Sequence, residues 1–513
     1  MLVSRRPEAD VSYTFPFTRI AGPAVSEENP LRSDRLLLGT AGAAMLLTQI
    51  ITVREMGSTF FSTEIVLIIA TVTALLGPSI GYWLGPRINE KIFTAWAIAS
   101  VVAIVLLPFG LRALVGLASA HGYEGRALCA VVLVGAFFFM PFFAVFLPRV
   151  AREPASLGVL YATELTGALV GLGALFLSPS WRVLVTMHWF LAVVVVYLGL
   201  RRWSITLPVA AAAMACSIFY PALDSGAARV YMAGYYEHAN PRVVATEYSP
   251  YQRIDIITDG LLPDLRPNRS LYLDGVPFYR AGDLDAFTVV LAQIPGSLIK
   301  PGRVLVIGSG SFSSAAHLFR QCHQVTVVEL DRAVARLGFE WFKPFHKLNH
   351  GDVNIVIDDG RRFLHRTRPA SFDLIVMDVP APYHVRTALL HTPDFYRLVK
   401  SRLRPGGVAA LSLCGSLNRE VGGSIAKSAA SVFDDIIVVR SGSVGLAVAY
   451  AGAALPFNPE VVEAAVRARD PEKSTIYSNA ETRHRIADRK PLDDAHLLPV
   501  LYLAGKEFRR AFQ

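Results

Sequence analysis

The stretch Arg303-Val-Leu-Val-Ile-Gly-Ser-Gly310 is followed, after one predicted helix, by Val327-Val-Glu-Leu-Asp331. Both begin as apolar runs typical of buried parallel strands, and both end on residues that can contact a ligand. Glycines at 308 and 310 let the backbone approach that ligand, while Glu329 can bind ribose hydroxyls from the end of its strand. This layout predicts a nucleoside site at the carboxyl edge of a doubly wound sheet.

Composition separates the chain into two unlike halves. Its 513 residues exceed one domain, and 53% of them are hydrophobic, concentrated in the first half. The net charge of +9 comes without any run rich in lysine and arginine, so we expect no nucleic-acid partner. The four cysteines lack CxxC spacing, so neither a disulfide framework nor a metal site is expected.

Seven apolar segments of the first half approach the roughly 20 residues that cross a bilayer. They are Leu36–Val53, Ile65–Leu84, Phe93–Leu117, Leu128–Leu147, Leu157–Leu177, Val183–Leu200 and Ile205–Leu223. Several are rich in glycine and alanine, which suits close packing of helices. We therefore expect a flexible tail over residues 1–33 and a multi-span α-helical membrane domain over residues 34–223, with the lipid bilayer as a partner.

Charged side chains at membrane depth are costly and point to function. Arg54, Glu55 and Glu64 are expected at the membrane interface, paired with each other. Glu164 falls in the middle of its segment and indicates either a polar cavity or a buried hydrogen bond. His188 is expected to be a hydrogen-bonded core histidine.

The second half is predicted to start with a small β-rich subdomain over residues 224–285. Its expected strands are Val243–Glu247, Arg253–Thr258 and Ser270–Leu273. Residues 286–513 then alternate strands with helices, which predicts an α/β doubly wound domain of the class I adenosylmethionine-methyltransferase-like Rossmann type. Its expected strands are Arg303–Ile307, Val325–Glu329, Val353–Ile357, Leu374–Asp378, Val408–Leu413, Asp435–Val439 and Leu446–Tyr450.

The kind of nucleoside can be narrowed from the residues around the glycine loop. A dinucleotide site favours G-x-G-x-x-G, but Ser313 stands at the third glycine position. Asp359-Gly360 follows the third strand, where a carboxylate can accept a hydrogen bond from an adenine amino group. The turn Arg404-Pro-Gly-Gly407 is typical of adenosylmethionine-dependent transferases. Together these features favour an adenosyl ligand.

With these residues the second half resembles the spermidine synthase (polyamine aminopropyltransferase) family from about Glu247 to Leu413. The matching motifs are Tyr251-Gln-Arg-Ile254, Leu271-Tyr-Leu-Asp-Gly275, Val304-Leu-Val-Ile-Gly308, Val328-Glu-Leu-Asp331, Asp359-Gly360, Phe372-Asp-Leu-Ile-Val-Met-Asp378 and Phe395-Tyr-Arg-Leu-Val-Lys400. The first half is loosely similar to a multi-span segment fused to some bacterial members. The resemblance thus implies a bacterial inner-membrane protein.

The resemblance also implies roles for single residues. Glu329 would bind the ribose and Asp359 the adenine, and Asp378 would be the catalytic aspartate, which acts as a base toward the acceptor amine or orients it. Donor-binding positions would be Gly308, Ser309, Gly310, Ser311, Glu329, Leu330, Asp359, Gly360 and Asp378. The acceptor pocket would be lined by Tyr251, Gln252, Tyr272 and His384. The co-substrate would be decarboxylated S-adenosylmethionine or S-adenosylmethionine, without a metal, and a homodimer is possible.

Three departures from the family pattern remove polar partners. Ser311 replaces an aspartate that receives the aminopropyl ammonium, Ala381 replaces a second carboxylate, and Phe287-Thr-Val289 replaces Tyr-His-Glu. Three functions therefore stay open. They are aminopropyl transfer to an amine, methyl transfer to a small or membrane-soluble acceptor, and a non-catalytic nucleoside-binding transporter or sensor.

The side of the membrane is a separate question. The tail and the arginine-bearing turns at 85–91, 149–154 and 201–202 alternate along the chain as cytoplasmic connections do. With seven spans, that pattern places the second half outside. Adenosyl donors are made in the cytoplasm, so we expect the second half inside, with either the first or the last segment not crossing.

Overall fold

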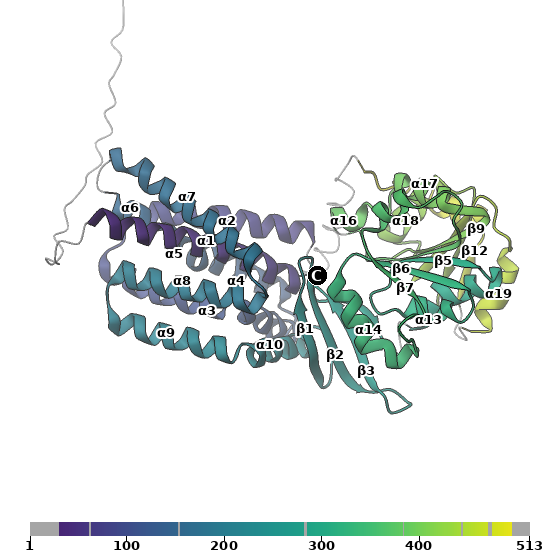
Figure 1. Ribbon diagram of the computed structural model, residues 1–513, viewed down its shortest axis with the longest axis horizontal. Helices are drawn as coiled ribbons and strands as arrows, with labels where there is room; N and C mark the ends of the chain where they lie inside the picture. The colour runs from purple at the N-terminus through teal and green to yellow at the C-terminus, as the bar shows by residue number, and fades with distance from the viewer. Residues whose placement is uncertain are drawn as a thin grey trace, which may run out of the picture.

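The computed structural model describes residues 30–60, 63–151, 154–281, 285–382, 384–442, 445–469 and 474–494. A helical half and an α/β half lie at opposite ends of the molecule, with a small antiparallel sheet between them (Figure 1). The expected tail lies outside the described residues, except that residues 30–33 already belong to the first helix.

The helical half is a bundle of long apolar helices. Its elements are α1 (Pro30–Thr59), α2 (Glu64–Leu84), α3 (Glu90–Ser119), α4 (Glu124–Val134), η1 (Gly135–Phe139), α5 (Pro141–Ala144), α6 (Phe146–Val150), α7 (Pro154–Leu177), α8 (Trp181–Leu200), α9 (Trp203–Ile218) and α10 (Tyr220–Tyr235). Within the described residues, six helical stretches are long and apolar enough to cross a membrane, or seven if the bent pair α9–α10 counts as one span.

The last predicted segment differs from its expected form. Helices α9 and α10 meet at a bend of 74°, within the predicted segment Ile205–Leu223. Residues 224–235 continue as helix α10, where a β-rich subdomain was expected to begin. A glycine contact explains how α10 is seated, because a Cβ on Gly234 would lie 1.8 Å from the carbonyl oxygen of Gly116 in α3. Small residues let these two backbones touch.

Polar side chains inside the bundle are paired across helices. Glu164 of α7 accepts a hydrogen bond from the Tyr82 hydroxyl at 3.1 Å, and His188 of α8 lies 2.6 Å from the Thr48 hydroxyl of α1. Both side chains are buried. His188 therefore has the hydrogen-bonded core position that the sequence predicted.

The two sheets have different topologies. The small sheet is an antiparallel meander of β1 (Pro241–Tyr248), β2 (Arg253–Leu261), β3 (Pro267–Leu273) and β4 (Val276–Arg280). The large sheet has the order β12-β10-β11-β9-β8-β5-β6-β7. Its strands are β5 (Arg303–Gly308), β6 (Gln324–Glu329), β7 (Asn354–Ile357), β8 (Phe372–Asp378), β9 (Leu403–Ser412), β10 (Asp435–Arg440), β11 (Ala447–Gly452) and β12 (Thr475–Tyr477).

Strands β5 to β9 are parallel, and β11 joins them antiparallel, so the predicted doubly wound architecture is present. The chain order reverses at β5, which has β6 on one side and β8 on the other. Such switch points are where doubly wound sheets bind ligands. The helices of this half are α11 (Asp285–Thr288), η2 (Val289–Gln293), α12 (Ile294–Ile299), α13 (Ser313–Phe319), α14 (Arg332–His346), α15 (Gly360–Arg366), α16 (Val385–Ala388), α17 (Pro393–Arg402), α18 (Glu420–Ala430), α19 (Pro459–Arg467) and α20 (Asn479–Arg485).

A buried ionic cluster joins the bundle to the small sheet. Arg112 of α3 pairs with Glu55 of α1 and, at 2.8 Å, with Asp224 of α10. Arg253 of β2 binds the same Asp224 oxygen at 2.8 Å and Asp255 at 2.7 Å. The expected pairing among Arg54, Glu55 and Glu64 is therefore wrong for Glu55, whose ionic partner is Arg112. The sequence signal that could have predicted this ion pair is Arg112, a lone arginine inside its apolar segment.

Breaking this cluster should destabilise the whole fold. Arg112→Ala leaves two buried carboxylates short of a partner, which typically costs about 3–5 kcal/mol. We expect a clear fall in melting temperature for the detergent-solubilised protein. Arg467→Ala, which removes an exposed pair with Glu463, should change stability by no more than about 0.5 kcal/mol. Equal melting temperatures for the two variants would contradict the structural role of the cluster.

Candidate functional site

The loop after β5 is shaped by glycine and by serine. Gly308 has φ +87°, and a Cβ there would lie 2.0 Å from the carbonyl oxygen of Asp378 at the tip of β8. Only glycine lets the two strand tips approach so closely. The Ser309 backbone N–H then donates to the Asp378 carbonyl oxygen at 3.1 Å. The predicted donor loop is therefore in direct contact with the backbone of Asp378, the predicted catalytic aspartate.

The same loop carries an unused polar atom. Ser309 is buried, and its Oγ has no hydrogen-bond partner among the described residues. Ser311 is also buried and accepts a hydrogen bond from the Ser313 backbone N–H at 3.3 Å. A buried hydroxyl without a partner is unfavourable unless a ligand or water satisfies it. This loop therefore suits a polar ligand group at Ser309.

Glu329 ends β6, the strand beside β5. One of its carboxylate oxygens accepts the Asp331 backbone N–H at 3.1 Å, and its side chain is only half-buried. Burial raises the pKa of Glu329 to about 7, and the nearby carboxylates of Asp331 and Asp378 add to this effect. Leu330 beside it is partly exposed at the sheet edge. Glu329 and Asp378 thus belong to one site.

Asp359 and Gly360 follow β7 on the same edge. The Asp359 carboxylate caps helix α15 by accepting the Arg362 backbone N–H at 2.8 Å, which uses one oxygen. The Asp358 backbone N–H donates to the Glu329 carbonyl oxygen at 3.1 Å, so the ends of β6 and β7 are tied together. Gly360 packs against Ile307, where a Cβ would lie 2.6 Å from a side-chain carbon.

Asp378 is the most strongly supported candidate for chemistry. Its carboxylate accepts a hydrogen bond from the Ser314 hydroxyl at 2.7 Å. Burial raises the pKa of Asp378 to about 6, which the Ser314 hydrogen bond partly opposes. Sequence reasoning missed Ser314, and it missed Cys414, whose thiol contacts the Val379 carbonyl oxygen at 3.5 Å. Burial raises the pKa of Cys414 to about 12, so this thiol is neutral.

Two of the predicted acceptor residues lie at the β1–β2 turn. Gln252 and Ser249 both donate to the Asp331 carboxylate, at 3.4 Å and 2.5 Å. Asp331 is therefore a link between the small sheet and the end of β6 that sequence reasoning did not identify. Tyr251 is 40% exposed, and the Arg386 guanidinium lies 5.8 Å from its ring centroid. These residues form a polar rim beside the site.

Tyr272 does not line an open pocket. It is fully buried, its hydroxyl lies 2.7 Å from His238 Nε2, and its ring packs 5.2 Å from that of Tyr236. His238 in turn contacts Asp259 at 2.6 Å. Tyr272 is therefore a core residue, because helix α10 and the turn after it cover that face of the small sheet, and its contact with the acceptor stays a prediction.

His384 and its neighbours lie in the loop after Asp378. His384 is half-buried, and burial lowers its pKa, although the Asp274 and Glu64 carboxylates oppose that effect. The Val385 backbone N–H donates to Glu64 of α2 at 2.9 Å. His391, further along, is fully buried and bonded to the Pro380 carbonyl oxygen at 3.1 Å, so it is a structural residue.

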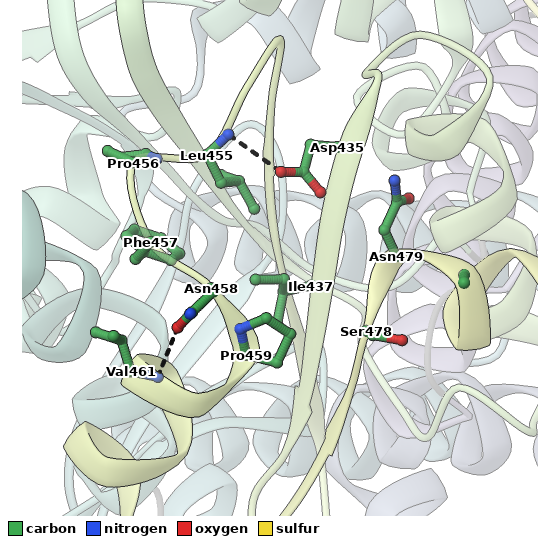
Figure 2. Close-up of a pocket in the computed structure, with 11 residues that line it drawn as sticks. Asp435, Ile437, Leu455, Pro456, Phe457, Asn458, Pro459, Val461, Ser478 and Asn479 are labelled. Atoms are coloured by element: carbon green, nitrogen blue, oxygen red, sulfur yellow. Dashed lines mark hydrogen bonds between the residues drawn. The ribbon is translucent and has the colours of Figure 1, made fainter.

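A separate surface hollow lies at the other edge of the large sheet. Figure 2 shows Asp435 and Ile437 of β10, with Phe457 and Asn479 on the surrounding segments. Its polar groups already bond within the fold, since Asp435 accepts the Leu455 backbone N–H at 3.2 Å. None of the residues that line this hollow belongs to the predicted site.

Comparisons with known proteins bear on the α/β half. Residues 284–446 match the family model of the spermine/spermidine synthase domain. A polyamine aminopropyltransferase of Nitrosomonas europaea is 29% identical over 203 residues, which are 39% of this chain and 60% of that protein. Polyamine aminopropyltransferase 2 of Hyperthermus butylicus is 32% identical over 214 residues, covering 40% of this chain and 63% of that protein.

Among solved structures, a spermidine synthase in complex with the transition-state analogue AdoDATO is similar with a TM-score of 0.39 and 20% identity. The similarity covers 51% of this chain and 89% of that one. The chain spans less than two thirds of the curated relatives named above, at 60% and 63% of their lengths. Residues 284–446, within the α/β half, thus match the spermine/spermidine synthase domain, the family that the sequence resembles.

Proposed function

We propose that the chain is a membrane-anchored transferase that moves an aminopropyl group from decarboxylated S-adenosylmethionine to an amine. The observation that carries this proposal is the contact between the β5 loop and β8, which places Asp378 beside the Gly308–Ser311 backbone and near Glu329. An acid beside a nucleoside site suits an acceptor that must lose a proton. The match to the spermine/spermidine synthase domain supports the same chemistry.

The reaction needs few groups from the protein. The amine nitrogen forms a bond to the carbon next to the sulfonium, the C–S bond breaks, and its electron pair stays on the neutral thioether sulfur. The amine proton passes to the Asp378 carboxylate, whose pKa of about 6 keeps it ionised at neutral pH. Alignment of the two reactants by the protein can lower the activation barrier by roughly 7–11 kcal/mol in favourable cases.

Methyl transfer from intact S-adenosylmethionine is the second candidate. The observation in its favour is the serine-rich donor loop, because Ser311 carries no charge to hold the ammonium of an aminopropyl group. Asp378 and Glu329 would keep the same roles in either reaction. Calorimetric titration with the intact and the decarboxylated donor separates the two, since the true donor binds more tightly.

The helical half supports a place in a bacterial inner membrane. Six apolar stretches of sufficient length carry this part of the proposal. Helix α9 has 16 residues, or about 24 Å, which is short for a hydrocarbon core of about 30 Å. A small-molecule acceptor and a homodimer remain predictions alongside it, as does the lack of a nucleic-acid partner.

Two considerations place the α/β half on opposite sides of the membrane. The supply of adenosyl donor favours the cytoplasm, and the distribution of arginines favours the outside. The turns bearing Arg149 and Arg201 lie at one end of the bundle, where Arg149 contacts Gly85 and Arg201 contacts Ser33. The small sheet and the α/β half adjoin the other end, where Arg54 donates to the Ser249 carbonyl oxygen at 2.6 Å and Glu64 accepts the Val385 backbone N–H at 2.9 Å. The positive-inside bias puts the first end in the cytoplasm. Adenosyl donors are made in the cytoplasm, so the reaction requires the α/β half on the cytoplasmic side. We propose the cytoplasmic placement of the α/β half.

Glu329→Gln should weaken donor binding about tenfold or more, because a charge-assisted hydrogen bond to the ribose is lost. In the wild-type protein the pKa of about 7 for Glu329 also predicts weaker binding as the pH falls below 7, with proton uptake on donor release. Calorimetry in buffers of different ionisation enthalpy measures both effects. Glu340→Gln, an exposed change on α14, serves as the control. Equal donor affinities for Glu329→Gln and this control would refute the ribose role.

Asp378→Asn should leave donor affinity unchanged and lower turnover about 10²–10⁴-fold, the usual contribution of a general base. Wild-type kcat/KM should fall as the pH drops below about 6, where Asp378 becomes protonated, and this limb should be absent in the variant. Product formation followed by mass spectrometry gives both rates. Full turnover by the variant would remove Asp378 from the chemistry.

Reporter fusions test the sidedness. A green fluorescent protein at the C-terminus should fluoresce, and alkaline phosphatase at the same place should be inactive, if the α/β half is cytoplasmic. The same reporters inserted in the 85–90 turn should give the opposite result, since this turn and the α/β half lie at opposite ends of the bundle. Active phosphatase at the C-terminus would remove the adenosyl-donor reaction from consideration.

A further inference from the structure

The carboxylate of Asp378 is held by the protein at only one of its two oxygens. Oδ2 accepts the Ser314 hydroxyl at 2.7 Å, and among the described residues no other hydrogen bond reaches this carboxylate. The residue is half-buried, so its side chain is not sealed inside the core. An ionised carboxylate accepts hydrogen bonds at both oxygens. Oδ1 is therefore the oxygen that stays open to a bound molecule.

Ser314 is fixed by its place in the fold. It is fully buried in the first turn of α13, directly after the loop that follows β5. The backbone of Asp378 is tied to the same loop, because its carbonyl oxygen accepts the Ser309 N–H at 3.1 Å. One short segment, residues 309–314, thus holds both the backbone and the carboxylate of Asp378. A carboxylate held in this way keeps one orientation toward the reactants, which is what catalysis by alignment needs.

The charges around Asp378 leave Ser314 as the group that favours its ionised form. The titratable side chains that interact with it are Glu329 at the end of β6 and Cys414 after β9. Glu329 and Asp378 repel each other when both are ionised, and burial raises the pKa of the Cys414 thiol to about 12, which keeps it neutral. Among the described residues no cation acts on Asp378, and its pKa is raised by burial and lowered by the Ser314 hydrogen bond. Without that hydroxyl the acid would keep its proton at higher pH.

We propose that Ser314 is a positioning residue whose hydroxyl holds Oδ2 of Asp378, so that Oδ1 takes the proton from the acceptor amine. This inference rests on the proposed transfer reaction, and it applies to aminopropyl and to methyl transfer onto an amine alike. The amine nitrogen bonds to the donor carbon, the C–S bond breaks with its electron pair on sulfur, and the amine proton moves to Oδ1. The proton then passes to water when the products leave, which returns Asp378 to its ionised form.

Ser314→Ala removes the hydroxyl and leaves the rest of the turn in place. The measurement is kcat/KM for putrescine across the pH range, with the detergent-solubilised full chain and saturating decarboxylated S-adenosylmethionine. Dividing the variant value by the wild-type value at each pH cancels the protonation of putrescine itself. Because Asp378 without its hydrogen bond keeps its proton at higher pH, the ratio should fall about tenfold between about pH 8 and about pH 5. The affinity for the donor, measured by calorimetry, should equal that of the wild type.

Three comparison variants separate the hydroxyl from the fold. Ser314→Thr keeps a hydroxyl and should give a ratio that does not change with pH. Ser314→Cys has a side chain of similar size and a weaker donor, so it should show the same fall as alanine, and it decides the question if the alanine variant does not fold. Ser313→Ala removes a buried hydroxyl of the same turn that lies 2.7 Å from the Thr288 hydroxyl, and its ratio should also be independent of pH.

The possible results distinguish the inference from the proposed function. A ratio for Ser314→Ala that is the same at every pH overturns the role of Ser314 and leaves the transfer reaction standing, even where the rate is lower throughout. An equal fall in Ser313→Ala also overturns it, because the effect then belongs to the turn as a whole. A wild-type protein that transfers nothing from either the intact or the decarboxylated donor refutes the proposed function, and the role of Ser314 with it.

Discussion

Two buried guanidinium groups hold the helical half of this protein against the small sheet. Arg112 and Arg253 share one oxygen of Asp224, and Tyr248 donates to Glu55 at 2.8 Å in the same cluster. Buried charges tolerate few arrangements, because each lost partner leaves an ion in an apolar interior. The cluster therefore fixes the small sheet against the bundle. That position in turn sets where the loops at Ser249 and Gly275 can lie.

The site is a consequence of parallel strand order. Strands β6, β5 and β8 are neighbours, so Glu329, the Gly308 turn and Asp378 arrive at the same edge although they lie far apart along the chain. Burial raises the pKa of both acids, and at Glu329 the charge of Asp378 adds to the effect. Both acids therefore hold a proton more readily than free carboxyl groups do.

Both halves of the chain contact the loops beside the candidate site. The β5 loop offers serine hydroxyls and a backbone turn, and the loop after Asp378 offers no acid. The described carboxylates that act on His384 in that loop belong to Glu64 of the bundle and Asp274 of the β3–β4 turn. The helical half therefore contacts the loops beside the candidate site directly.

Sequence patterns alone determined the parallel strands, the glycine turn, the acids at positions 329 and 378, and the long apolar segments. The strands and apolar segments follow from the local periodicity of apolar residues. The turn follows from glycine at position 308, because glycine adopts a positive φ without strain. Tertiary structure decided the rest. Tyr272 is a core residue because α10 covers it. Glu55 forms an ion pair with Arg112, and Gln252 donates a hydrogen bond to Asp331. Glu64 and Val385 are 321 positions apart. Neither periodicity nor spacing can encode a contact over such a separation, which arises only when the two halves pack together.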